Sequence, residues 1–551
     1  MLLYLTSHHQ PFFIFSVITF SSFIYLSPQA VAQAKVDINS QNSNSLDLAE
    51  VKRKSYFLDS DFPDISPDEL NKYLEPFFML AQKPSQDEDK MHVPTGDSET
   101  ITEIVVRFVD QDGNPVEGKT KPNIIKQEFA LKPGDVYRAD LAQVGLERVL
   151  YLNIVEDASL SLEQVVDSKQ AVMAISVQEK GQLAIAFGLT LPPPTALQGV
   201  VKPTTVNALS DAADGFSAAV QFGLRNLGGT NQEASLGIEG GASAFGFNLG
   251  YRKFIRSDRG FGANFYNQRG VEAEFDDGDP NLNLDNGADP WVHRFGGGVE
   301  YFTPLAQDWQ SAIGVSYQQV TIRDGAFTAN LEATDEAGNR LTVNDSGRDE
   351  FLTLNFATVL NRQDNPAFPT RGYKLLFGSD QYFSLAGRDI LANRLAANYT
   401  HYFPVPLFGF TDGAKTLIFN LQGGTILGDA LPYDSFILGG SSIVRGYDDS
   451  EISTSRSFVQ TSLEYRFPLY NLSAFNQDLP INGALFIDYA SDLGSADAVI
   501  GQPAVVRNRP GDGLGYGLGI QTRSPIGLIR TEFALNDQGD SEFIFSVGDR
   551  F

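Results

Sequence analysis

The C-terminal two thirds of the chain alternates between apolar and polar side chains in short segments. From about residue 182 onward, stretches of roughly ten residues with this alternation are separated by clusters of Gly, Asp, Asn and Pro. Successive side chains of a strand point to opposite faces, so the pattern predicts strands with one apolar face. We expect about sixteen strands, an even number as in bacterial membrane barrels, at 182–191, 216–226, 231–242, 245–255, 260–270, 293–303, 311–322, 351–361, 371–382, 393–404, 415–427, 457–468, 482–490, 513–523, 527–536 and 542–551.

The alternation is sharpest near the C-terminus, where it places charged residues on one face. In 457–468 the apolar phase holds Val459, Thr461, Leu463, Tyr465, Phe467 and Leu469, and the polar phase holds Gln460, Ser462, Glu464 and Arg466. In 482–490, Leu485, Ile487 and Tyr489 oppose Phe486 and Asp488. A barrel in a membrane turns its apolar face to lipid and its polar face to the lumen. The pattern therefore predicts that Glu464 and Asp488 face the lumen.

The N-terminus predicts secretion. An apolar stretch from Pro11 to Leu26 precedes Ala30, Val31 and Ala32, a small-x-small cleavage pattern. Residues 1–32 therefore resemble a signal peptide, with an uncleaved anchor as the alternative because only His8 and His9 stand before the apolar stretch. Beyond residue 35 no run of about 18 apolar residues occurs, so a membrane-bound mature chain would have to form a closed barrel. A soluble β-sandwich would alternate similarly, but the terminal aromatic Phe551 after a secretion signal favours the membrane.

Two regions lie between the signal and the strands. Residues 33–100 have the composition of a disordered leader, with a short helix at 66–80 that begins with the capping box of Ser66, Pro67 and Glu69. Residues 101–180 are expected to form a small α+β domain. Its predicted elements are a strand from Ile101 through Val109, helices at Pro122–Leu131 and Ala139–Leu152, and strands near 154–166 and 171–179. Residues 181–551 would then be the barrel.

Composition agrees with a mainly β protein and excludes several functions. The chain has Gly 51, Phe 41 and Tyr 20 against Met 4 and Trp 2, which suits glycine-punctuated strands rich in aromatic residues. A net charge of -27 without a basic run argues against a nucleic-acid partner. With no Cys, disulfides and thiolate chemistry are excluded. The five His residues are not at metal-ligand spacing, and no G-x-S-x-G motif occurs, so we expect no enzyme activity, no metal and no cofactor.

Two other patterns have simpler interpretations. The alternating glycines Gly513, Gly515, Gly517 and Gly519 do not fit a nucleotide-binding loop and instead predict a strand with one glycine face that leaves space for an inserted loop. The acidic run from Glu274 to Asp279 lacks the layout of a calcium loop and is interpreted as a solvated loop.

One motif resembles a known family. Leu438 to Tyr447, which reads LGGSSIVRGY, lies in the long connection between the eleventh and twelfth segments and resembles the VRG(F/Y) loop of the BamA/TamA superfamily of outer-membrane proteins. Residues 226–231, 462–465 and 486–489 resemble further phrases of that family. The element order of 101–180, with LKPGDVY at 131–137, resembles the family's periplasmic POTRA domain. The resemblance covers about 101 to 551.

The resemblance implies a site inside the barrel. In this family the long loop folds into the lumen, and its arginine meets carboxylates on the wall, so Arg445 of the motif Val444, Arg445, Gly446 and Tyr447 would bind Asp488 and Glu464. The family also implies a loosely paired seam between the first and last strands, for which Gly188, Gly548 and Phe551 are candidates.

The implied function is handling of unfolded polypeptides in the outer membrane. The first hypothesis is an assembly factor that receives a client through its POTRA domain, which would lie in the periplasm, and inserts it into the bilayer at the seam, with possible accessory periplasmic subunits. The alternative is a two-partner type transporter that passes a secreted client through the lumen, with the helix at 66–80 as a plug. A passive pore would leave the POTRA-like domain unexplained. A single such domain departs from the family's usual several.

Overall fold

The computed structural model describes most of the chain after residue 92. The described residues are 2–5, 93–96, 99–164, 169–188, 217–242, 244–276, 278–306, 308–365, 368–474, 477–524, 527–547 and 549–551. The predicted leader with its helix at 66–80 and most of the predicted signal peptide at 1–32 lie outside these ranges. Of the signal peptide, only β1 (Leu2–Leu5) is described, and it pairs antiparallel with β22.

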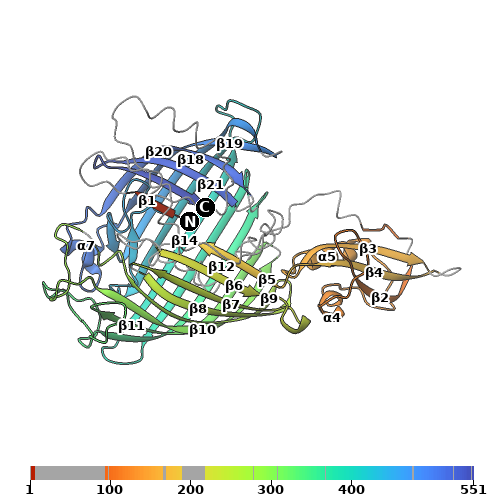
Figure 1. Cartoon of the computed structure of the whole chain (residues 1–551), viewed down its shortest axis with the longest axis horizontal. Coiled ribbons are helices and arrows are strands. Elements are labelled where there is room, and N and C mark those ends of the chain that lie inside the picture. Colours follow the sequence, from red (N-terminus) through yellow and green to blue (C-terminus); the bar gives the residue numbers. More distant parts are fainter. Residues whose placement is uncertain are drawn as a thin grey trace, which may run out of the picture. The chain divides into compact units, whose positions relative to one another are not determined.

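The C-terminal region is an antiparallel β-barrel, which confirms the predicted fold class. Among the described residues it has sixteen strands besides β1, and Figure 1 shows them side by side around the barrel. They are β5 (Leu183–Gly188), β6 (Ser217–Leu224), β7 (Gln232–Gly241), β8 (Ala244–Arg256), β9 (Arg259–Val271), β10 (Trp291–Ala306), β11 (Trp309–Arg323), β12 (Arg348–Gln363), β13 (Gly372–Ser384), β14 (Leu391–Pro404), β15 (Thr416–Gly428), β18 (Ser457–Ala474), β19 (Gln477–Ser491), β20 (Asp512–Ser524), β21 (Gly527–Asn536) and β22 (Ser541–Val547).

The strands follow one another around the ring in chain order. The sheet order places the first strand, β5, next to the last, β22. Because neighbouring strands are antiparallel, the strand connections alternate between two ends of the barrel. We call the end at which β5 begins the near end and the other the far end. Among the connections that the structure describes, the long ones at the far end are 272–290, 324–347, 429–456 and 492–511. The third of these contains the short hairpin β16 (Phe436–Leu438) and β17 (Ser453–Ser455), and the last contains η2 (Ala496–Ala498) and α7 (Pro503–Val506).

Exposure of the side chains follows the predicted alternation. On β19, the outward-facing Leu485 and Ile487 are 42% and 45% exposed, whereas Asp488 on the opposite face is fully buried. The outward residues Tyr465 and Phe467 of β18 are buried for a different reason. The near-end turn 405–415 folds back over the outer wall, and Phe408 packs against both rings. Tyr465 and Phe467 therefore still face outward, as the alternation predicts, and they are buried because this turn covers them.

The predicted last strand is shorter than expected. Segment 542–551 was predicted to run as a strand to the terminal residue, but β22 ends at Val547. Asp549 and Arg550 instead form ion pairs with Arg466 and Asp488. These partners belong to the inward face, so the tail turns toward the lumen.

Residues 100–179 form a small three-stranded sheet with two helices. The elements are β2 (Thr100–Phe108), α4 (Pro122–Lys126), α5 (Ala139–Leu150), β3 (Val155–Gln164) and β4 (Gln170–Glu179), and the sheet order is β2-β4-β3 with β2 and β4 parallel. The helix predicted at 122–131 ends at Lys126, because the chain then turns to place the Phe129 ring against Gly145 of α5. This contact belongs to a core of its own, which also contains Ile101, Leu146 and Ile175.

Among the described residues, no helix is both long enough and apolar enough to cross a bilayer.

Candidate functional site

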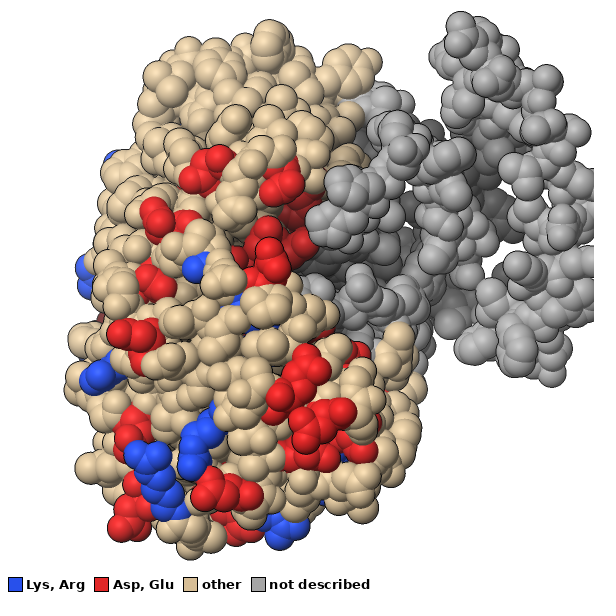
Figure 2. All heavy atoms as spheres, turned by 90° about the vertical axis from the view of Figure 1, so that its left-hand side faces the viewer, with Lys and Arg blue, Asp and Glu red and all other residues tan. Residues whose placement is uncertain are grey.

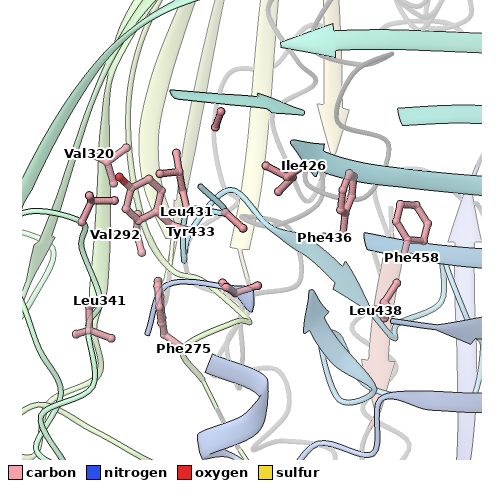
Figure 3. Packing of buried hydrophobic residues seen from close by; sticks show 14 of the residues in the cluster. Phe275, Val292, Val320, Leu341, Ile426, Leu431, Tyr433, Phe436, Leu438 and Phe458 are labelled. Carbon is pink, nitrogen blue, oxygen red and sulfur yellow. The ribbon is translucent and has the colours of Figure 1, made fainter. Parts of the chain in front are cut away.

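The far-end connection 429–456, which we call the lumen loop, is folded and buried. Its apolar side chains pack against the inner wall: Phe436 of β16 lies against Phe458 of β18, with ring centroids 4.7 Å apart. Figure 3 shows these two rings together with Leu438 of the loop and Ile426 of β15. The loop is thus held by hydrophobic contacts as well as by the polar ones described below.

The same apolar cluster continues across the far end of the barrel. Val292 of β10 and Val320 of β11 meet Leu431 and Tyr433 of the lumen loop, and Phe275 and Leu341 join them from two other far-end connections (Figure 3). Close packing of this kind leaves little room for water. The far end of the lumen therefore holds packed apolar side chains from β10, β11, the lumen loop and two other far-end connections.

Arg445 of the lumen loop lies at the centre of a buried ion cluster. Its Nε donates to Asp488 Oδ2 at 2.7 Å and its Nη2 to Asp488 Oδ1 at 3.0 Å. Its Nη1 donates to Glu464 Oε2 and to Glu532 Oε1, both at 2.7 Å. The guanidinium carbon is 3.4 Å from the centre of the Phe486 ring, a cation–π contact. A planar guanidinium with five donors suits several carboxylates at once.

The structure thus brings together the three charged residues that the sequence analysis named. Glu464 lies on β18 and Asp488 on β19, and both are buried with Arg445. The third acid, Glu532 of β21, was missed. Its strand shows the same alternation, with Phe533 facing outward at 44% exposure and Glu532 buried. That phase was a usable signal, but it could not place β21 beside the loop.

Electrostatics favour the charged form of this arginine. Burial alone would lower the pKa of Arg445, but the carboxylates of Asp488, Glu532 and Glu464 outweigh it and raise the pKa above its ordinary value. Breaking a buried ion pair by deleting one member costs on the order of 3 to 5 kcal/mol. The cluster is therefore suited to fixing the loop and contains no group prepared for bond-making chemistry.

The neighbours of Arg445 in the motif also contact the wall. Gly446 donates its N–H to Glu542 Oε2 at 2.9 Å and accepts from Asn536 Nδ2 at 2.9 Å. The Tyr447 hydroxyl donates to Asp537. Val444 is fully buried. Glu542, Asn536 and Asp537 belong to β21, β22 and the turn between them, so the motif contacts the end of the barrel wall next to the seam.

The glycine face of β20 makes this close approach possible. A Cβ on Gly515 would lie 2.0 Å from the carbonyl oxygen of Arg445, and one on Gly513 would lie 2.8 Å from the Tyr447 ring. Gly515 also stands directly between Asp488 and Asn536 in the strand register. Gly446 has a φ of +97°, a left-handed conformation that favours glycine. The loop backbone therefore lies directly on the wall where side chains are missing.

A second ion cluster holds the start of the lumen loop and was not predicted. Arg294 of β10 donates to Glu272 at 2.5 and 2.6 Å and to the carbonyl oxygen of Tyr433 at 2.6 Å. The Tyr433 hydroxyl donates to Asp349 Oδ2 at 2.6 Å. These contacts fix the loop to the opposite side of the wall from Arg445, on strands β10 and β12.

The predicted seam residues are only partly described. Gly188 is the last residue of β5 and pairs with Ala219 of β6. Gly548 lies outside the described residues. Phe551 follows the end of β22, and the guanidinium of Arg466 lies 5.8 Å from its ring centre. Gly188 thus lies in the first strand and Phe551 just beyond the last. Their role at the seam stays a prediction.

The surface at the far end is acidic. Figure 2, which shows the left-hand side of Figure 1, has more Asp and Glu than Lys and Arg side chains, and no large basic patch is visible on the described part of this face. The described residues contain no group of three or more His, Cys, Asp or Glu that could hold a metal ion.

Comparison with known proteins gives the following relatives. The Omp85 superfamily domain model matches residues 226–551, more than half of the chain. Outer envelope protein 80, chloroplastic, of Arabidopsis thaliana is 27% identical over 453 residues, which cover 81% of this chain and 57% of that protein. Protein TOC75-3, chloroplastic, of the same plant is 24% identical over 488 residues, covering 82% and 55%. The chain thus spans less than two thirds of the length of these relatives.

Among solved structures, the chain is similar to BamA from Haemophilus ducreyi lacking POTRA domains 1–3. The TM-score is 0.53 with 16% sequence identity, and the match covers 81% of this chain and 84% of that structure. At this identity the likeness concerns the fold alone.

Proposed function

The chain belongs to the Omp85 superfamily of outer-membrane and outer-envelope proteins, as its sequence motif suggested. From this membership we propose that it is a non-enzymatic assembly factor. It would insert unfolded polypeptides into the membrane at the seam of its barrel. The observation that carries the proposal is the lumen loop packed inside the barrel. Arg445 with its three carboxylates and the apolar cluster around Tyr433 occupy the interior, so a client is better accommodated at the edge of the sheet than through its centre.

The end of the last strand supports the seam as the working edge. After β22 the tail leaves the sheet, and Asp549 and Arg550 pair with Arg466 and Asp488 instead of continuing the strand. An edge with unpaired N–H and C=O groups accepts another strand. A client strand would therefore compete for pairing at the β5–β22 junction more readily than elsewhere. Gly188, Gly548 and Phe551 are the residues we assign to this junction.

The lumen loop would hold the wall beside the seam in a defined shape. Its motif binds β18, β19 and β21 through Arg445 and reaches Glu542 of β22 through Gly446. In this proposal Arg445 is a positioning residue, and Glu464 and Asp488 are its anchors.

The small domain would receive the client before insertion. We propose that residues 101–180 are a POTRA-type domain on the periplasmic side, supported by the order strand, helix, helix, strand, strand. Its sheet order leaves β3 at one edge. At the other edge, Thr100 of β2 already pairs with Val136, and the carbonyl oxygen of Phe108 accepts from the N–H of Val116. An extended client would add to the free side of β3 by β-augmentation. Accessory periplasmic subunits would bind this domain too.

Transport of a secreted client through the lumen is the alternative. It requires the lumen loop and the far-end cluster to leave together, which would expose at least the Arg445 carboxylates. Deleting 66–80 and measuring conductance tests the plug that this alternative includes, since an unchanged current would remove it.

Depletion of the protein followed by outer-membrane proteomics tests the proposal. Broad loss of membrane barrels supports an insertion factor, loss of one secreted protein supports the transporter, and neither loss supports a passive pore. Complementation with Arg445→Ala should fail while the barrel still folds. Arg362→Gln is the matched control, because Arg362 is exposed and its side chain contacts Tyr373 and Asp308, away from the lumen loop.

A further inference from the structure

The C-terminal tail enters the ion cluster of the lumen loop. Arg550, the penultimate residue, donates from Nη1 to both oxygens of Asp488 at 2.9 Å. Asp488 is the carboxylate that also binds Arg445. One buried acid therefore holds two guanidinium groups, one from the lumen loop and one from the end of the chain.

Arg550 also contacts the lumen loop directly. Its Nη2 donates to the carbonyl oxygen of Ile443 at 2.8 Å and to that of Ser442 at 3.3 Å, immediately before the motif. The side chain is 3% exposed. It thus links three parts of the chain: the tail after β22, the wall at β19 and the loop.

Asp549 makes a second link between the tail and the cluster. It accepts from Arg466 of β18 through both oxygens, at 2.7 and 2.8 Å. Arg466 in turn donates to Glu464 at 2.7 Å, and Glu464 is a partner of Arg445. The tail therefore shares Asp488 with the lumen loop and is linked to Glu464 through Arg466.

We propose that Asp549 and Arg550, which we call the C-terminal latch, position the lumen loop and couple its seating to the end of β22. While the latch is seated, the loop is held; when the end of β22 moves outward, Arg550 leaves Asp488 and the loop is released. The proposal rests on the proposed function in one respect, because opening at the seam is what would move β22.

Of the two cations that bind Asp488, Arg550 is the more easily released. Arg445 pairs with three carboxylates, whereas among the described residues Arg550 pairs with Asp488 alone. Burial and the nearby charge of Arg445 both lower the pKa of Arg550 below its ordinary value. The tail can therefore leave first, and its departure removes the bonds that hold the loop at the carbonyl oxygens of Ser442 and Ile443.

Single-cysteine labelling tests the latch on the purified full-length protein. The chain has no Cys, so Ser441→Cys in the lumen loop introduces one unique thiol, at a position 8% exposed. We expect Arg550→Gln to raise the rate of maleimide labelling at this site about tenfold, the factor that corresponds to about 1.4 kcal/mol. Arg550→Lys should give an intermediate rate, and Arg362→Gln should label as the parent does.

A milder variant and a reciprocal measurement complete the test. Asp549→Asn keeps every Arg550 contact and should raise labelling only about threefold, which guards against misfolding of Arg550→Gln. Coupling is reciprocal, so Arg445→Ala should speed labelling of a thiol placed at Phe551→Cys. Unchanged rates in folded Arg550→Gln and Asp549→Asn, or in the reciprocal pair, would overturn the latch. If labelling rises as expected but depletion leaves the outer membrane unchanged, the latch stands and the proposed insertion function falls.

Discussion

Gly515→Ala provides a steric test of how the lumen loop is seated. Gly515 lies on β20 between Asp488 and Asn536, and an alanine Cβ there would be 2.0 Å from the carbonyl oxygen of Arg445 and 3.0 Å from Val444 Cγ1. Real Cβ atoms essentially never approach another heavy atom within 3.0 Å. The loop backbone must therefore move by at least about 1 Å, because the obstructing atom is backbone and cannot rotate away.

The displacement is large enough to break the ion cluster. A nitrogen–oxygen distance of 2.7 Å from Arg445 to its carboxylates becomes roughly 3.7 Å after such a shift, beyond the hydrogen-bond limit of about 3.2 Å. Overpacking costs about 1 to 3 kcal/mol, and weakened buried ion pairs add to this. We expect a loss of about 3 kcal/mol in the free energy of unfolding, together with a mobile loop.

Urea unfolding of the purified barrel and maleimide labelling of Ser441→Cys measure the two effects. Gly240→Ala is the matched control, because Gly240 also lies in a barrel strand and its added Cβ would meet only Phe245, at an ordinary 3.9 Å. If Gly515→Ala matched Gly240→Ala in stability and in labelling, the close approach of the loop to β20 would be refuted.

Three further changes test other parts of the barrel. Arg445→Lys should cost about 2 kcal/mol in unfolding free energy, since one ammonium group cannot bind three carboxylates in the geometry of a guanidinium; stability equal to wild type would contradict the cluster. Burial raises the pKa of Glu451 in the lumen loop to about 7 from 4.5, so the folded loop binds this proton more tightly than the unfolded chain and its stability should fall as the pH rises from about 4.5 through 7. Hydrogen exchange of the loop at pH 5.5 and pH 8 should show this loss, and Glu451→Gln should remove it. Tyr465→Phe deletes the hydroxyl that accepts from the amides of Leu407 and Phe408, so exchange in turn 405–415 should accelerate by roughly tenfold, as expected for about 1 to 2 kcal/mol, while the far-end loops stay protected.

The sequence predicted the barrel well because alternation is a local property. Each of the sixteen predicted segments overlaps one strand, and the lumen-facing phase of Glu464 and Asp488 followed from their own strands alone. Strand ends were less accurate: β10 and β18 extend beyond their predicted segments, and β22 stops short. Ends depend on hydrogen bonds to neighbouring strands, which a single segment does not contain.

The missed acid depends on the curvature of the sheet. Glu532 approaches Arg445 from a strand three positions beyond β18, and the curved wall formed by these strands brings it to the loop. Arg550 was missed for another reason, because the terminal residues were interpreted as the end of a lipid-facing strand. Its contact with Asp488 requires the tail to leave the sheet.

The position of the ion cluster along the chain bears on how the barrel is made. Arg445, its three carboxylates and Arg550 are separated by no more than about a hundred residues, all in the last five strands and the loop before them. Short sequence separation favours early contact formation. The acids on β18, β19 and β21 would repel one another without the arginine, so the loop has to be threaded as these strands assemble. Biogenesis of the barrel should therefore begin at its C-terminal end, with the other strands added to the last five.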